Sequence, residues 1–150
     1  MTIYVDGSYS NTYQVASCAF CVVKDGEIID VRKKAKRIKK GNSVVSELLG
    51  VVMALKYCKL KGISQVTIVH DYNEIPMFAS SYRRTKNHIV NNYIKELIKL
   101  KNQIDVSFKK VKAHTNDKFN NLVDKLSREN LRNYIEKELP KILKGQLKKN

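Results

Sequence analysis

The sequence has 150 residues, 43% of them apolar, and 29 lysines and arginines against 14 acidic residues give a formal net charge of +15. This length and apolar content favour one folded domain with a sizeable core and exclude a chain that is disordered throughout. No apolar run reaches the roughly 18 residues that a membrane span needs, and no signal-peptide pattern opens the sequence.

The first part of the chain predicts an antiparallel meander of three strands. Ile3–Val5 is a short apolar strand, and Asp6-Gly7 after it is typical of a turn. Ala16–Val23 is a second strand, and the hairpin signal Asp25-Gly26 joins it to a third strand from Glu27 to about Lys39.

A helix with apolar periodicity over Val44–Cys58 follows, with Asn42 and Ser43 as candidate N-caps and Gly62 as its stop signal. The continuous apolar run Val66–Val69 is typical of a strand that is buried on both faces.

The remaining elements complete an α/β fold. A short segment over Asn73–Ala79 precedes a helix carried by residues 89–98, a strand over Val106–Val111 and a last helix over Asn120–Leu139. Pro140 weakens the helical pattern, so residues 140–150 are expected to form a basic C-terminal tail. The order β-β-β-α-β-α-β-α predicts a five-stranded mixed sheet, three strands antiparallel and then two parallel, with helices packed on it.

Four acidic residues occupy positions where a carboxylate is costly. Asp6 and Asp71 each follow an apolar strand, while Glu47 and Asp124 border the apolar stripes of two helices. Each alone has an ordinary explanation as a turn or helix-edge residue. Together they predict a carboxylate cluster, which requires cations to offset the repulsion between its members. Hard ions with oxygen ligands, Mg²⁺ or Mn²⁺, fit such a cluster, and two of them can promote phosphodiester hydrolysis.

Four motifs, taken in their order along the chain, resemble those of the type 1 ribonucleases H over about residues 2–135. They are Tyr4-Val5-Asp6-Gly7-Ser8, Ser46-Glu47-Leu48, Val69-His70-Asp71-Tyr72, and Val111-Lys112-Ala113-His114 followed by Asn120 and Asp124.

The resemblance implies a ribonuclease H catalytic domain over residues 1–139. It implies an endonuclease that hydrolyses the RNA strand of RNA–DNA hybrids and leaves 5′-phosphate and 3′-hydroxyl ends. The implied catalytic residues are four metal ligands that hold two Mg²⁺ ions and a loop histidine that helps proton movement or product departure. They are Asp6, Glu47, Asp71 and Asp124 as ligands, and His114 as the histidine. Substrate contacts are expected from the motifs and from the basic segment before residue 87: Gly7, Ser8, Asn42, Ser43, Arg83, Arg84, Lys86 and Asn120.

The sequence also departs from the family pattern. The span from Asp71 to His114 is too short for the extra basic helix with which many members grip hybrids. Asn121 stands where an acidic residue is frequent, so a fifth acidic ligand is not expected. Affinity for the substrate must therefore come from other basic residues.

The basic run from Arg32 to Lys40 has two explanations. Strand alternation would divide its side chains between two faces, so they cannot all meet one ligand. They either protect an exposed sheet edge from aggregation or contact a nucleic-acid backbone.

Cys18 and Cys21 have CxxC spacing, but only Cys58 could join them, so core packing is preferred to a zinc site. Three cysteines are too few for a secreted disulfide framework. We therefore expect a cytoplasmic monomer with a nucleic-acid partner and no membrane association.

Other functions of the same fold are alternatives: a resolvase-like nuclease, a domain derived from a reverse transcriptase, or an inactive module that binds hybrid or duplex RNA. A DEDD-type exonuclease is disfavoured, because its first motif needs a glutamate where Ser8 stands.

Overall fold

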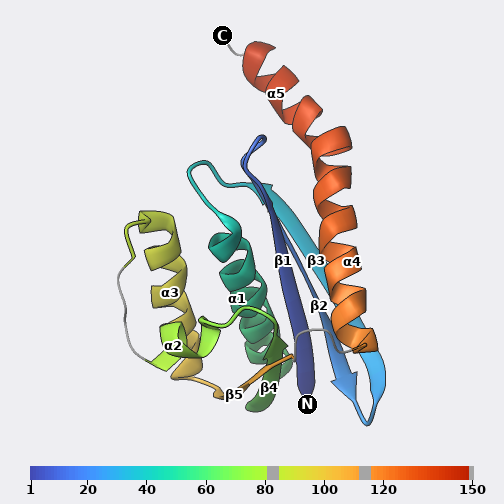
Figure 1. The fold of residues 1–150 in the computed structure, drawn as a ribbon, viewed down its shortest axis with the longest axis vertical. Coiled ribbons are helices and arrows are strands. Elements are labelled where there is room, and N and C mark those ends of the chain that lie inside the picture. Colours follow the sequence, from blue (N-terminus) through green and yellow to red (C-terminus); the bar gives the residue numbers. More distant parts are fainter. Residues whose placement is uncertain (81–84, 112–115, 149–150) are drawn as a thin grey trace.

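The computed structural model describes residues 1–80, 85–111 and 116–148, arranged around a five-stranded sheet of order β3-β2-β1-β4-β5 (Figure 1). β1 (Thr2–Ser10) pairs antiparallel with β2 (Val15–Lys24), and β2 pairs antiparallel with β3 (Glu27–Arg37). On its other side β1 pairs in parallel with β4 (Gln65–His70), which pairs in parallel with β5 (Asp105–Lys110). The predicted mixed sheet is therefore confirmed.

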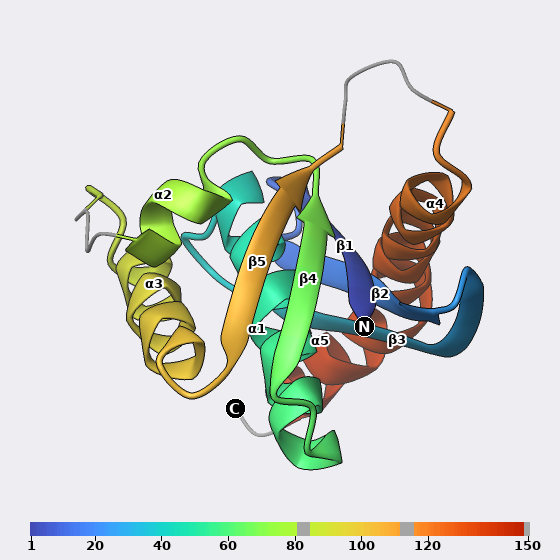
Figure 2. The same cartoon turned by 90° about the horizontal axis from the view of Figure 1, so that it is seen from below.

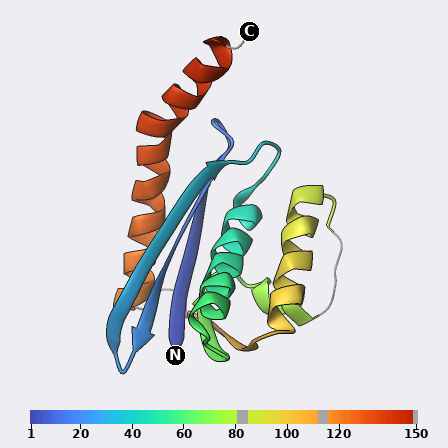
Figure 3. The same cartoon turned by 180° about the vertical axis from the view of Figure 1, so that it is seen from behind.

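Helices cover both faces of the sheet. α1 (Ser43–Lys61) and α3 (His88–Lys101) lie side by side on one face, and the short α2 (Ile75–Ser80) lies beside α3 (Figures 2 and 3). α4 (Lys118–Asn133) lies on the opposite face against β1 and β2. No helix within the described ranges combines the length and the apolar character needed to cross a membrane.

The core has two parts, one on each side of the sheet. The larger joins β1, β2, β4, α1 and α3, and it contains Cys18 and Cys58. The smaller lies under α4, where Cys21 packs with Val123. All three thiols are free and buried, which agrees with the predicted packing role of the cysteines.

The structure also confirms the predicted turn and cap residues. Asp25 and Gly26 both have positive φ angles, 52° and 78°, the geometry of a two-residue type I′ hairpin. The Asn42 side chain caps α1 by accepting a hydrogen bond from the Val45 amide at 3.2 Å, and the helix ends at the left-handed Gly62.

β1 continues beyond its predicted end. Asp6 and Gly7 were expected to form a turn, but they pair with Ala19 and Cys18 of β2, and the strand runs on to Ser10. The backbone hydrogen bonds of this ladder outweigh the local turn preference of Asp-Gly. Asp6 consequently lies in the middle of a strand, not at its end.

The C-terminal helix also differs from the prediction. It begins at Lys118, because the Asp117 side chain accepts hydrogen bonds from the amides of Phe119 and Asn120 at 3.0 Å. After α4 the chain passes through one π-helical segment, Tyr134–Glu138, into α5 (Leu139–Lys148). Pro140 has no amide hydrogen and would clash with a regular preceding turn, and the wider π geometry accommodates its ring. The residues after Pro140 therefore continue the helix up to Lys148, and α5 extends past the sheet (Figure 1).

β1 and α1 come into backbone contact at Gly7. A Cβ atom on Gly7 would lie 2.4 Å from the Ser46 carbonyl carbon and 2.8 Å from the Glu47 amide nitrogen. The Ser46 hydroxyl donates a 2.7 Å hydrogen bond to the Ser8 carbonyl oxygen across the same contact. Glycine is thus required at position 7 by the approach of the helix.

We expect Gly7→Ala to lower the free energy of unfolding by about 1–3 kcal/mol or more, because backbone atoms of α1 would have to move to admit the methyl group. Gly50→Ala is the matched control in the same interface: its Cβ would lie 3.4 Å from the nearest atoms, in ordinary contact, and alanine favours the helix. Urea denaturation of both variants checks this, and equal stabilities would contradict the close-approach argument.

Candidate active site

Three of the four predicted carboxylates converge. Oxygen atoms of Asp6, Glu47 and Asp71 lie within 4.8 Å of one another. Asp6 comes from the middle of β1 and is only 3% exposed, Glu47 comes from the first turns of α1, and Asp71 directly follows β4. The contact at Gly7 brings the first two together, and the parallel pairing of β1 with β4 brings the third to them.

Asp124 lies beside this group on α4. It is close enough to raise the pKa values of both Asp6 and Asp71, but it is not one of the three whose oxygens lie within 4.8 Å. Its carboxylate accepts a 2.7 Å hydrogen bond from Arg128 one turn along the helix. The fourth acid therefore adjoins the cluster and already has a cationic neighbour.

The cluster strongly disfavours its own ionisation. Burial is the main cause of the raised pKa values of Asp6 and Glu47, and the neighbouring carboxylates add to it. The Gly7 amide, which donates a 2.8 Å hydrogen bond to Asp6 Oδ1, partly opposes this rise. The pKa of Asp71 is also raised, first by desolvation and then by Asp124.

The donor set fits a divalent cation. Three carboxylates within a few ångströms supply hard oxygen ligands, and among the described residues no lysine or arginine donates a hydrogen bond to any of these three. A bound cation would remove the repulsion that raises their pKa values and would keep them ionised at neutral pH. Asp6, Glu47 and Asp71 are thus the residues able to hold a metal, with Asp124 at the edge.

Serine hydroxyls connect the elements that carry the acids. The Ser8 and Ser127 hydroxyls lie 3.1 Å apart and join β1 to α4. The Asn130 amide donates a 3.2 Å hydrogen bond to the Ser17 hydroxyl of β2 a turn further on. These contacts, with the bond from Ser46 to β1, fix both helices against the strand that carries Asp6.

No sequence motif assigns a role to His70, which directly precedes Asp71 and ends β4. Its ring is fully buried, and Nδ1 lies 2.8 Å from the Tyr72 carbonyl oxygen, so the bond spans Asp71. Burial lowers the pKa of His70, which indicates a neutral ring with the proton on Nδ1. The signal that could have revealed it is its position at the end of a largely apolar strand.

The predicted substrate contacts are only partly gathered around the cluster. Ser8 borders it, and Asn120 lies on α4 one turn before Asp124, with a buried Oδ1 that has no hydrogen-bond partner within the described ranges. Asn42 and the exposed Ser43 lie at the start of α1. Lys86 is exposed before α3.

Three predicted site residues lie outside the described residues. Arg83 and Arg84 belong to 81–84, and His114 belongs to 112–115.

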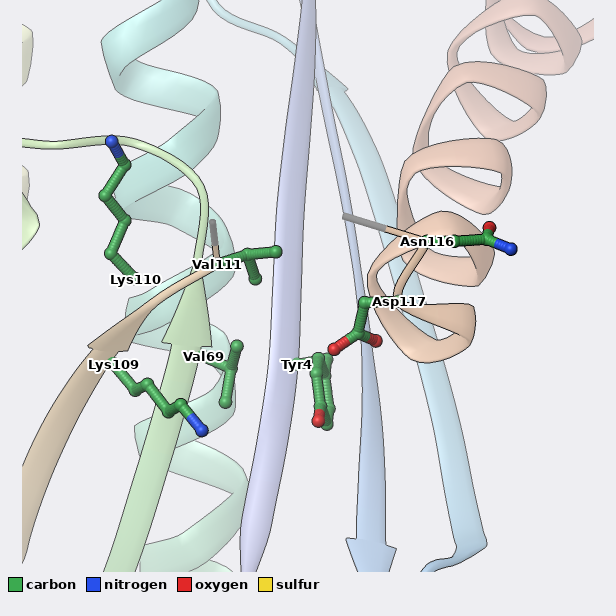
Figure 4. Close-up of a pocket in the computed structure, with 7 residues that line it drawn as sticks. All are labelled: Tyr4, Val69, Lys109, Lys110, Val111, Asn116 and Asp117. Carbon is green, nitrogen blue, oxygen red and sulfur yellow. The ribbon is translucent and has the colours of Figure 1, made fainter. Parts of the chain in front are cut away.

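A cavity of about 400 Å³ opens over β4 and β5 (Figure 4). It lies on the same face of the sheet as α4, in the part that α4 does not cover. Lys109, Lys110 and Val69 line one side of it, and Figure 4 shows Asp117 pointing toward Tyr4 on the other. Its described lining contains none of the four acids.

Comparisons with known proteins agree with this geometry. The RNase H family model matches residues 1–132. RNase H1 from the archaeon Halobacterium salinarum NRC-1 is similar in structure, with a TM-score of 0.71, 19% identity, and coverage of 88% of this chain and 97% of that one. The N-terminal RNase H domain of rv2228c from Mycobacterium tuberculosis has a TM-score of 0.72 at 15% identity, covering 90% and 96%. A comparison with curated protein sequences gives no significant match.

The fold and the acidic cluster define a ribonuclease-type α/β domain with a candidate metal centre. The family match extends over most of the chain, and this protein belongs to the RNase H family. RNase H enzymes are hydrolases that generally depend on divalent metal ions, and the acidic cluster lies in the part of the chain that the family model matches.

We expect the metal-free protein to lose stability as the pH rises from about 5 to about 8. The folded-state pKa values of Asp6, Glu47 and Asp71 lie above the ordinary carboxyl values near 4, so in this interval the folded state binds more protons than the unfolded state. Thermal unfolding in EDTA measures the effect, and Asp6→Asn should flatten the decline. A stability that rises with pH would contradict the raised pKa values.

Proposed function

We propose that this chain is an endonuclease that hydrolyses the RNA strand of RNA–DNA hybrids. Asp6, Glu47, Asp71 and Asp124 would hold two Mg²⁺ ions, with Mn²⁺ as a possible substitute. The observation that carries the proposal is the convergence of three carboxylates with raised pKa values in a chain of net charge +15. A basic surface attracts a polyanion, and an acidic centre in such a surface, with Asp6 buried and Asp71 exposed, suits cations that act on phosphate.

The proposed reaction exchanges one phosphorus–oxygen bond for another. The oxygen of water forms a bond to the scissile phosphorus, the bond from phosphorus to the 3′-oxygen breaks, and that oxygen takes up a proton. The products carry 5′-phosphate and 3′-hydroxyl ends. Bound divalent ions would supply charge stabilisation for the attacking and leaving oxygens.

The protein's own part in this scheme is placement and proton transfer. The Gly7 amide and the Ser46 hydroxyl fix the backbone on which Asp6 and Glu47 are presented. His114 is proposed to move a proton or to aid product departure. Substrate contacts are proposed for Gly7, Ser8, Asn42, Ser43, Arg83, Arg84, Lys86 and Asn120.

The buried Oδ1 of Asn120, which has no hydrogen-bond partner among the described residues, supports the part of Asn120 in this proposal. A buried oxygen without a partner loses its hydration and gains nothing in return, unless a ligand supplies a donor. A ribose 2′-hydroxyl is such a donor, and it also distinguishes RNA from DNA.

The test is incubation of an end-labelled RNA–DNA hybrid with the protein and Mg²⁺. EDTA serves as the control, and duplex RNA, duplex DNA and single-stranded RNA are compared. We expect internal cuts in the RNA strand of the hybrid alone, abolished by EDTA. Binding of the hybrid without cleavage in Mg²⁺ or Mn²⁺ would support the inactive-module alternative instead.

Asp71→Asn should reduce hybrid cleavage by about 10²- to 10⁴-fold while leaving hybrid binding in place, because a charged ligand is lost from the transition-state charge network. Asp25→Asn, at the exposed β2–β3 hairpin, makes the same chemical change away from the cluster and should cleave normally. Initial rates and fluorescence anisotropy on one hybrid give both quantities. Unimpaired cleavage by Asp71→Asn would remove this residue from the site.

A further inference from the structure

A basic groove lies between α1, α3 and β3. It combines two adjoining cavities, of about 190 and 440 Å³, which share Lys56, Asn92 and Glu96 in their linings. Glu96 is the one acidic residue in the described lining. Six lysines line the groove: Lys34, Lys36, Lys56, Lys59, Lys95 and Lys99. Below, this set is called the lysine groove.

The lysine groove faces away from the acidic cluster. On α1, Lys56 follows Glu47 by nine residues, or about two and a half helical turns, so the two side chains project from opposite sides of the helix. Lys34 and Lys36 extend from the same face of β3, since they pair with Cys18 and Ala16, whose side chains lie in the core under α1. The strand alternation predicted for the basic run thus sends one subset of its side chains into this groove.

Most of the positive charge in the lysine groove is unneutralised. Within the described part of the chain, Lys56 forms an ion pair with Glu96, and none of the other five groove lysines has an acidic partner within ion-pair distance. Lys34, Lys59, Lys95 and Lys99 are exposed. Like charges gathered in a concave surface repel one another, and a polyanion relieves that repulsion.

Tyrosine rings on the same face hold cations in place. Lys36 Nζ lies 5.9 Å from the centre of the Tyr93 ring, and Arg32 lies 5.6 Å from that of Tyr57, just beyond the groove. A cation on an aromatic face keeps its full charge but has fewer conformations to lose on binding. These rings are covered by cations and are not free to stack on bases, so recognition would be through phosphates.

We propose that the lysine groove binds a single nucleic-acid strand by its phosphate backbone, at the same time as the acidic cluster engages the hybrid. A duplex, whose major groove alone is about 12 Å wide, is broad beside two cavities of about 190 and 440 Å³ and could meet only the rim of the groove. One strand can follow the channel between α1 and α3. The contacts are independent of base sequence, and they extend the protein's hold on nucleic acid beyond the hybrid itself.

The test uses a single-stranded DNA of twelve thymidine nucleotides in a buffer that contains EDTA. This probe contains no RNA, so its binding does not depend on whether the protein cleaves hybrids, and failure of the hydrolysis proposal would leave this result unaffected. In ¹⁵N NMR titration we expect the largest amide shifts at residues 49–59 and 92–99. Largest shifts around residues 6, 47 and 71 would place the strand at the acidic cluster and overturn the proposal.

Neutralisation of the groove gives a second measurement. The triple variant Lys34→Gln, Lys36→Gln, Lys95→Gln should weaken binding of the probe about tenfold or more at low salt. It should also reduce the slope of log affinity against log salt by about 2, as expected for three lost phosphate contacts on a single strand. Lys56 stays in place because it is paired with Glu96.

The matched control triple is Lys24→Gln, Lys137→Gln, Lys144→Gln, which removes the same charge from exposed positions outside the groove. It should change affinity less than about twofold. Equal losses in both triples would show attraction by net charge alone, and no loss in the groove triple would leave Lys34 and Lys36 as protection of the β3 edge. Either result overturns the proposal.

Discussion

The backbone contact between β1 and α1 at Gly7 is the constraint on which the site depends. Without a side chain at this position, the Ser46–Glu47 peptide comes against the strand, and the Ser46 hydroxyl bonds to the Ser8 carbonyl oxygen. Asp6 and Glu47 are then neighbours although 41 positions separate them in the sequence. Asp6, which directly precedes Gly7, is only 3% exposed, and burial is the first cause of its raised pKa. Close packing and raised pKa values therefore occur together at this site.

The closeness of the carboxylates lowers the stability of the fold, although the chemistry of the site requires it. Carboxylates held together and away from water are costly to ionise, so without a cation the cluster destabilises the folded chain at neutral pH. Hydroxyl contacts among Ser8, Ser46 and Ser127, together with the core under α1 and α4, hold the elements in place despite that cost. A rigid frame is what a metal site needs, because its ligands must be in position before the ions arrive.

Much of the fold followed from the sequence, because periodicity and turn residues act locally. Such signals predict the order of elements along the chain, the mixed sheet, the Asp25-Gly26 hairpin and the Asn42 cap. They do not predict the extension of β1, since pairing of Asp6 and Gly7 with β2 depends on a tertiary partner that overrides a local turn signal. The structure begins α4 at Lys118, before the predicted Asn120, because Asp117 caps the helix through the Phe119 and Asn120 amides. The helix through Pro140 needed a π-helical segment that no residue pattern announces.

In the candidate site, too, some features follow from local sequence patterns and others from tertiary contacts. The acids are identifiable because each interrupts an apolar pattern. The neutral, buried ring of His70 and the Asn120 Oδ1, which lacks a partner among the described residues, emerge only from three-dimensional contacts. The charge of the chain follows a related logic. α1 presents Glu47 toward the acidic cluster and Lys56 toward the lysine groove, so one helix separates opposite charges onto two sides. A net charge of +15 therefore does not surround the acids evenly, and the cluster keeps the raised pKa values that suit it to cations.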